Sequence, residues 1–407
     1  MVRTINDTHY AGGERKRLRT GEFALAMAVL LNNLSQLPFF VENEQSSLIC
    51  MVAWMLAAVP LILLLVIGNR ANFNRLVMSF LLPGGILIAT AFFGVITQNS
   101  YSLLNKNILI SLATYAVAFL YSSVDKDLDP APVIKTYIFS ATVVAIVIYF
   151  QFFSSADAVY EIRYAYASKN SVAFIFLAAL IMCMTKKKET KAWKRWVYAI
   201  CGVILVGLVI LLKSRSAYIG VALSLLVVLQ TKDFDKRIKR LVGVVLVGLL
   251  LLLLLKPSVY DFVVDNLLLS NKRAEGLDAV SSGRISILKS FPQKIEGNYW
   301  LGAGSEYFEC FPLASLINYG VILGPLVILF SLSPLYWYAR CRRSMEVHER
   351  VMFLCFAVSF YSNALFECLA PFGPGAKCSV LWVMIGLFYG RQRAGKTNDS
   401  TGMGTAV

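Results

Sequence analysis

Long apolar stretches recur along this chain and limit how it can fold more than any other feature. Most of them are roughly 17 to 22 residues, the length that a helix needs to cross about 30 Å of hydrocarbon. The 407 residues are 57% hydrophobic and only 15% charged, so a single water-soluble core cannot bury all their apolar side chains. The strands of a membrane barrel would be shorter and alternating. The sequence therefore predicts an all-α integral membrane protein.

We predict about twelve transmembrane helices in a single polytopic membrane domain over residues 1–407. The approximate spans are 23–42, 48–67, 76–97, 103–122, 133–153, 170–185, 195–212, 216–230, 240–256, 310–331, 350–368 and 378–390.

Positive charge is concentrated in alternate connecting segments. Most of the 39 Lys and Arg residues fall on one predicted side, in segments that include 15–19, 186–195, 232–240 and 340–350. By the positive-inside rule, both termini are expected in the cytoplasm. Basic segments beside a bilayer ordinarily lie on anionic lipid, so the net charge of +15 does not predict nucleic-acid binding.

One predicted outside segment is much longer than the others. Residues 257–309 connect the ninth and tenth spans, and a connection of about fifty residues is typical of a functional segment. Within it, "SSGRISILKSF" predicts a helix capped by Ser281 or Ser282, with Arg284 in or near its first turn. The following "LGAGSEYFE" supplies Gly302 and Gly304 for a turn before the next span.

Two cations and two hydroxyls interrupt the apolar sequence at "LLKSRSAYIG", residues 211–220. They are Lys213, Ser214, Arg215 and Ser216, at the predicted outer mouth of the seventh and eighth spans. Arg215 could simply extend to the lipid headgroups. However, arginine at the membrane centre costs roughly 2.5–3.5 kcal/mol, so a cation near that depth usually faces a partner or a cavity. A guanidinium suits phosphate, and the serines add donors.

The order of these segments resembles the O-antigen polymerase and ligase family, of the Wzy and WaaL type. The resemblance covers roughly residues 165–330 and rests on "SRSAYIG", then "SSGR" and "GAGSEYFE" in the outside loop, then "ECFPLASLINYGVILG". It implies a GT-C-like glycosyltransferase of the bacterial inner membrane that takes undecaprenyl-diphosphate-linked glycans on the periplasmic face. It implies neither a metal nor another cofactor, and it suggests a chain-length regulator of the Wzz type as a partner.

The resemblance assigns the donor's diphosphate to Arg215 and Arg284, with Lys213 assisting. This role agrees with the chemistry, because cleavage of a sugar–diphosphate bond places negative charge on the leaving group, where fixed cations stabilise it.

The acceptor hydroxyl needs a base, and here the subfamilies differ. Ligases resemble one another in a His-Asn pair before the tenth span, but this chain has only His9 and His348, both predicted cytoplasmic. Counting back from Gly320, Glu309 occupies the histidine position. We therefore expect Glu309 to act as general base or to orient the acceptor. The alternatives are a Glu309 that is paired with a loop cation, or Glu306 as the active carboxylate.

A second group on the same predicted side is "YEIRYAYASKN", residues 160–170. Arg163, Tyr164, Tyr166 and Lys169 could bind sugar, since tyrosine offers an apolar face and a hydroxyl. An interfacial aromatic belt explains the tyrosines equally well. Asn170, at the start of the sixth span, resembles an asparagine found in family members.

The preferred interpretation is a polymerase that joins lipid-linked repeat units, and two other functions and two local features stay open. An O-antigen ligase, which transfers glycan to lipid A core, is the runner-up, and a lipid-linked glycan flippase or another transporter is the alternative of a different class. "DKDLD", residues 125–129, imitates a metal-binding pattern but is expected to form a turn or helix cap. Cys368 and Cys378 flank a predicted outside loop and could form a disulfide.

Overall fold

The computed structural model describes residues 20–67, 70–97, 101–125, 127–154, 169–187, 191–261, 263–265, 278, 283–373 and 375–402. Every regular element in that part of the chain is helical. The helices are α1 (Thr20–Leu34), α2 (Pro38–Glu42), α3 (Ser46–Ile67), α4 (Arg70–Thr97), α5 (Ser102–Val124), α6 (Ala131–Phe152), α7 (Lys169–Thr185), α8 (Ala192–Leu211), α9 (Arg215–Gln230), α10 (Lys236–Leu255), α11 (Pro257–Asp261), α13 (Arg284–Lys289), α14 (Phe291–Ile295), α15 (Phe311–Ser331), α16 (Ser333–Cys341), α17 (Val347–Ala364) and α18 (Ala376–Gly402).

A helix overlaps each predicted apolar stretch, which supports the all-α membrane class. Within the described residues, five segments are long and apolar enough to cross a membrane: Leu104–Val124, Ala131–Phe152, Ala192–Leu211, Lys236–Leu255 and Phe311–Cys341. Shorter apolar helices cover Ser46–Val59, Gly84–Ile96, Lys169–Thr185 and Arg215–Gln230. The count of about twelve spans and the cytoplasmic position of the termini stay predictions.

The first predicted span, 23–42, is wrong as a single helix. Helix α1 ends at Leu34, and α2 begins at Pro38. A proline disfavours helical geometry in the residue before it, and Leu37 is accordingly extended, with φ −60° and ψ 140°. Proline has no N–H to donate, so it is tolerated in the first turn of the new helix.

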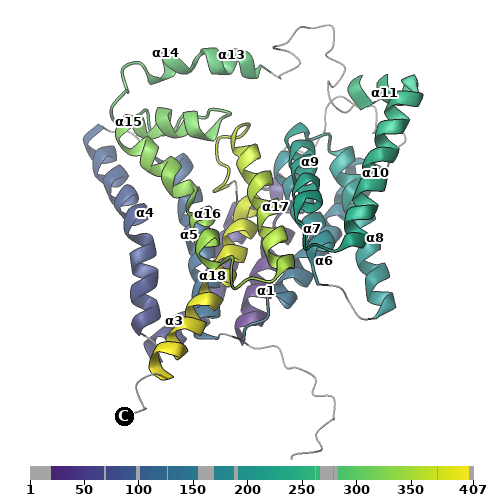
Figure 1. Cartoon of the computed structure of the whole chain (residues 1–407). Helices are drawn as coiled ribbons and strands as arrows, with labels where there is room; N and C mark the ends of the chain where they lie inside the picture. Colours follow the sequence, from purple (N-terminus) through teal and green to yellow (C-terminus); the bar gives the residue numbers. More distant parts are fainter. Residues whose placement is uncertain are drawn as a thin grey trace, which may run out of the picture.

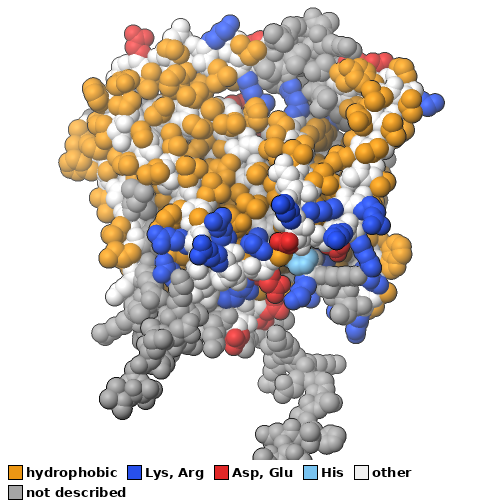
Figure 2. Space-filling model, viewed as in Figure 1, with side chains coloured by type: hydrophobic (Ala, Val, Ile, Leu, Met, Phe, Trp, Pro, Cys, Tyr) orange, Lys and Arg blue, Asp and Glu red, His pale blue; other side chains and the backbone are white. Residues whose placement is uncertain are grey.

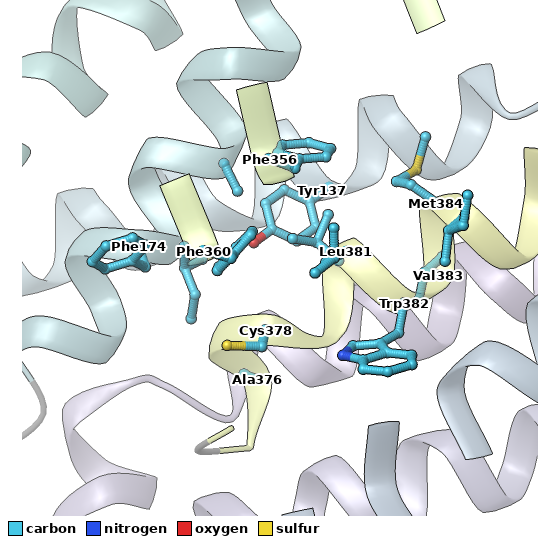
Figure 3. Close-up of a cluster of buried hydrophobic side chains, with 14 of the residues drawn as sticks. Tyr137, Phe174, Phe356, Phe360, Ala376, Cys378, Leu381, Trp382, Val383 and Met384 are labelled. Carbon is cyan, nitrogen blue, oxygen red and sulfur yellow. The ribbon is translucent and has the colours of Figure 1, made fainter. Parts of the chain in front are cut away.

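The core lies where α6, α7, α17 and α18 meet (Figure 3). Tyr137, Phe174, Phe356 and Phe360 project from three of these helices towards the α18 segment that contains Leu381 and Trp382. Helix α18 also packs along α5. A side chain on Gly386 of α18 would come within 2.8 Å of the Tyr115 carbonyl oxygen, so glycine permits this close helix contact.

The surface divides into an apolar band and a basic end. Figure 2 shows a broad hydrophobic surface above a belt of Lys and Arg at the lower end, where the C-terminus also lies in Figure 1. Of the five candidate spans in the described residues, α10 is the least buried, with only 6% of its apolar window inside the protein. Exposed apolar surface of this extent is typical of contact with lipid.

Helix α15 is broken at Gly320, where φ is 65° and ψ is −173°. This conformation is almost restricted to glycine. In Figure 1, α15 changes direction sharply below α13 and α14 at the upper end of the bundle. A continuous tenth span over 310–331 is therefore wrong. The candidate membrane-spanning segment is Phe311–Cys341, which includes the break and continues beyond α15 through α16.

The segment 299–304 supplies hydrogen-bond partners on both sides of this break. Residues before Gly320 offer carbonyls that can no longer bond along the helix, and residues after it offer N–H groups. Four backbone hydrogen bonds satisfy them: Ala303 N to Ile317 O (2.7 Å), Gly304 N to Asn318 O (3.1 Å), Val321 N to Tyr299 O (3.0 Å) and Ile322 N to Trp300 O (3.4 Å). The break is thus an ordered joint in the chain.

Substituting Gly320→Ala is expected to destabilise the protein by about 1–3 kcal/mol, because alanine cannot readily adopt this conformation. The added methyl group would also overlap the Trp300 carbonyl. The measurement is the midpoint of thermal unfolding in detergent.

The matched control is Gly248→Ala in α10, where an added methyl group meets nothing within 4 Å. This control should leave the midpoint unchanged or raise it slightly. Equal midpoints for the two variants would contradict the account of the break.

Candidate functional site

The predicted cations meet at the end of the bundle opposite the basic belt. Lys213 and Ser214 form the turn between α8 and α9, and Arg215 is the first residue of α9. Lys213 has a φ of 45°, which is uncommon for a residue with a side chain. Figure 2 shows basic side chains inside a hollow at this upper end.

Arg284 joins the long loop to this site. It is the first residue of α13, as the sequence predicts. The N-cap is Gly283, with φ 80° and no side-chain cap, so the predicted capping by Ser281 or Ser282 is wrong; both serines lie outside the described residues. Its Nε atom lies 3.0 Å from Glu309 Oε2, and its Nη2 donates to the Phe366 carbonyl at 3.5 Å. The guanidinium also lies over the Phe366 ring, 5.4 Å from its centroid. Charge pairing and the aromatic face together fix the orientation of Arg284.

Several cations lie close enough together to repel one another. Coulombic repulsion acts between Arg215 and Arg284, and also between Lys169 and both Lys213 and Arg215. Burial lowers the pKa of Lys213, which means that its charged form is already disfavoured by desolvation. A partly buried group of like charges is stabilised by an anion, so this arrangement favours anion binding.

A hydrogen-bonded polar chain crosses the same end of the bundle. Ser214 Oγ donates to Asn170 Oδ1 at 3.1 Å, and Asn170 Nδ2 donates to Glu367 Oε1 at 3.2 Å. Ser214 and Ser216 hydroxyls lie 3.4 Å apart. These contacts connect α7, α9 and the segment after α17, so Asn170 and both serines belong to one network with Glu367.

Glu367 and Lys377 are site residues that the sequence reasoning missed. Lys377 is fully buried, and its Nζ atom lies 3.9 Å from Glu367 Oε1 and 4.8 Å from the Phe174 ring centroid. Their signal in the sequence is a carboxylate and an amine on either side of "CLAPFGPGA", within or beside predicted spans. Charged residues near membrane depth usually have a partner or a function.

Tyr307 is a further residue that the sequence reasoning missed. Burial raises the pKa of the Tyr307 hydroxyl, and the negative charges of Glu367 and Glu309 raise it further, while Arg284 opposes them. The side chain therefore lies within electrostatic range of both carboxylates. Its ring offers an apolar face, and its hydroxyl offers a polar end.

Other predicted site residues lie away from this cluster or outside the described residues. Gly302 and Gly304, with φ of 78° and 89°, belong to the α15 joint. Glu306 forms its own ion pair with Lys294 at 2.7 Å. The structure does not describe Arg163, Tyr164 and Tyr166, whose predicted contacts stay untested.

Three sequence alternatives can be compared with the structure directly. Asp125 accepts from Asp127 N (3.1 Å), and Asp129 accepts from Ala131 N (2.9 Å), which supports the turn interpretation. The N-cap of α6 is Pro130, without a side-chain cap. Within the described ranges, no group of three or more His, Cys, Asp or Glu could hold a metal ion. Cys368 and Cys378 are both buried free thiols, so the alternative of a disulfide between them is wrong.

Comparison of the chain with known protein families and with curated proteins found no match. The site is therefore interpreted from its own chemistry, and the family resemblance stays a prediction.

Glu367→Gln should destabilise the protein by about 3 kcal/mol, because it leaves the buried Lys377 ammonium without its carboxylate. Thermal unfolding in detergent measures the effect.

Glu306→Gln serves as the control, because its partner Lys294 is about one-third exposed, and pairs of this kind contribute roughly 0–1 kcal/mol. If the two variants unfold alike, Glu367 does not compensate the buried charge.

Proposed function

We propose that this protein is a membrane glycosyltransferase that polymerises undecaprenyl-diphosphate-linked oligosaccharide repeat units on the periplasmic face of the bacterial inner membrane. The observation that carries the proposal is the joint presence of Arg215, Arg284 and Glu309 at one end of a helical membrane bundle. The ligase and transport alternatives are outcomes of the test below.

The cations suit the diphosphate of a lipid-linked donor. Arg215 and Arg284 come from different elements, the start of α9 and the start of α13, so a bound diphosphate would connect the bundle to the loop. Arginine keeps its charge and can make two parallel hydrogen bonds to phosphate oxygens. Both residues would thereby stabilise the negative charge that develops on the leaving diphosphate.

The ion pair between Arg284 and Glu309 suggests how donor binding prepares the acceptor step. A diphosphate competes with Glu309 for Arg284, because both are oxyanions and the guanidinium Nε is already engaged at 3.0 Å. Glu309 released from that contact can accept the proton of an acceptor hydroxyl. The hydroxyl oxygen then attacks the anomeric carbon, the bond from that carbon to the diphosphate oxygen breaks, and the configuration inverts.

Glu367 and Tyr307 extend this proposal beyond the residues expected from the sequence. Glu367 is held by Asn170 and Lys377, so its carboxylate has a fixed orientation. Tyr307 is half-exposed and can place its ring against a sugar. We assign Glu367 to positioning and keep Glu309 as the base, because Glu309 lies directly against a donor-binding arginine.

Arg215→Ala and Glu309→Ala are each expected to lower polymerisation by at least about 100-fold, a typical loss when a transition-state contact or a base is removed. The measurement is the glycan length distribution on a gel from cells in which only the variant is present. Lys289→Ala is the control, because Lys289 is an exposed cation of α13 and should leave the ladder unchanged.

The pattern of the remaining glycan separates the functions. Single repeat units attached to the final anchor indicate a lost polymerase, whereas polymer retained on the lipid carrier indicates a lost ligase. Donor retained on the cytoplasmic side indicates transport. Inserted and folded Arg215→Ala and Glu309→Ala variants that polymerise at the wild-type rate would overturn the proposal.

A further inference from the structure

A second site lies at the opposite, basic end of the bundle and takes no part in the proposed reaction. A groove of about 800 Å³ opens between α8 and α10, with α7 and α9 as its floor. Figure 1 shows α8 and α10 at the outer edge of the molecule. Its volume is in the range of roughly 300–1,000 Å³ found for ligand sites.

The inner part of the groove is apolar. Its walls and floor consist mainly of aliphatic side chains, including Leu177, Leu180, Val206, Val221, Leu225 and Val245. The polar Ser224 is already satisfied, because its hydroxyl lies 2.9 Å from the Ser359 hydroxyl. An occupant of this part therefore needs to be a hydrocarbon.

The mouth of the groove is basic. Lys186, Lys187, Arg195 and Arg237 contribute to its lining, and Asp235 is the single acidic residue among the described lining residues. The Asp235 carboxylate accepts from the Arg237 backbone N–H at 2.8 Å, so it is engaged in capping α10. Lys186 is placed over the Tyr198 ring, with its Nζ atom 3.4 Å from the ring centroid.

Basic side chains at the edge of an apolar helix surface are typical of the lipid headgroup region. Lys186 and Lys187 follow the end of α7, and Arg237 lies in the first turn of α10. Figure 2 shows a belt of Lys and Arg bordering the apolar surface. The apolar windows of α8 and α10 are only 28% and 6% buried within the protein, and exposed apolar helix surface of this extent is typical of lipid contact. An amphiphile there would place its chain in the groove and its head among the cations.

We propose that this groove binds an anionic glycerophospholipid of the adjoining leaflet, with an acyl chain between α8 and α10 and its phosphate at Lys187, Arg195 and Arg237. Charge complementarity identifies the occupant, because clustered Lys and Arg beside transmembrane helices favour anionic headgroups. The inference does not depend on the proposed glycosyltransferase activity.

Native mass spectrometry of the full-length protein in detergent tests the proposal, with phosphatidylglycerol and phosphatidylcholine as competing probes. Wild type is expected to retain one phosphatidylglycerol with at least about tenfold preference. Lys187→Gln, Arg195→Gln and Arg237→Gln combined should abolish the preference. The control combines Arg340→Gln, Arg342→Gln and Arg343→Gln, which remove three exposed cations outside the groove and should preserve it.

A second pair of variants tests the apolar part without changing charge. Gly202 and Gly207 both belong to α8, and an added side-chain carbon meets nothing within 4 Å at either position. Only Gly202 lines the groove. Gly202→Leu should therefore lower lipid retention at least about fivefold, whereas Gly207→Leu should not.

Three results would overturn the proposal. Wild type could retain both lipids equally, the two triple variants could lose phosphatidylglycerol equally, or Gly202→Leu could retain as much lipid as Gly207→Leu. A dimer that dissociates only with Gly202→Leu would instead assign the groove to a second copy of the chain.

Discussion

The backbone hydrogen bonds around Gly320 are the constraint on which the candidate site depends. Backbone groups at membrane depth need partners inside the protein, and the break in α15 would otherwise leave several unpaired. Segment 299–304 provides them, from Ala303 and Gly304 on one side and from Tyr299 and Trp300 on the other. These backbone hydrogen bonds hold segment 299–304 against α15, just before Glu309 in the chain. The Arg284–Glu309 ion pair then joins α13 to the same unit.

The two ends of the molecule differ in the charges that they offer. The end with α13 combines Arg215, Arg284 and Lys213 with Glu309 and Glu367, so it can hold an anion beside a proton acceptor. The other end has a belt of Lys and Arg beside an apolar groove. Both arrangements suit amphiphilic phosphates. At the first end the Arg284–Glu309 pair is part-buried, whereas at the other end Lys187 pairs with an exposed Glu346 at 3.5 Å.

The sequence predicted the helical class and singled out several residues of the candidate site, but it did not predict the break in α15 or the end of α1. Apolar length locates helices because each one must cross the same hydrocarbon thickness, and Arg215, Arg284 and Glu309 stood out as charges beside such stretches. The sequence did not predict the break at Gly320, because one glycine barely changes the mean hydropathy of a span. The break is stabilised by backbone contacts with 299–304, which are distant from any local pattern. Pro38 was the readable signal for the end of α1 and was overlooked. Glu367 pairs directly with Lys377 across a folded loop and accepts a hydrogen bond from Asn170, almost two hundred residues away. Local sequence patterns do not encode such contacts.

The sidedness of the candidate site is the central claim that can be measured most directly. Lys289→Cys in α13 and Arg342→Cys at the end of α16 would each be treated with a membrane-impermeant thiol reagent in intact cells. The parent chain gives the baseline, since six of its eight cysteines are buried and two are partly buried. Labelling of Lys289→Cys in intact cells, with Arg342→Cys labelled only after permeabilisation, would place the α13 end outside. The reverse pattern would contradict a periplasmic site and with it the proposed use of lipid-linked donors on that face.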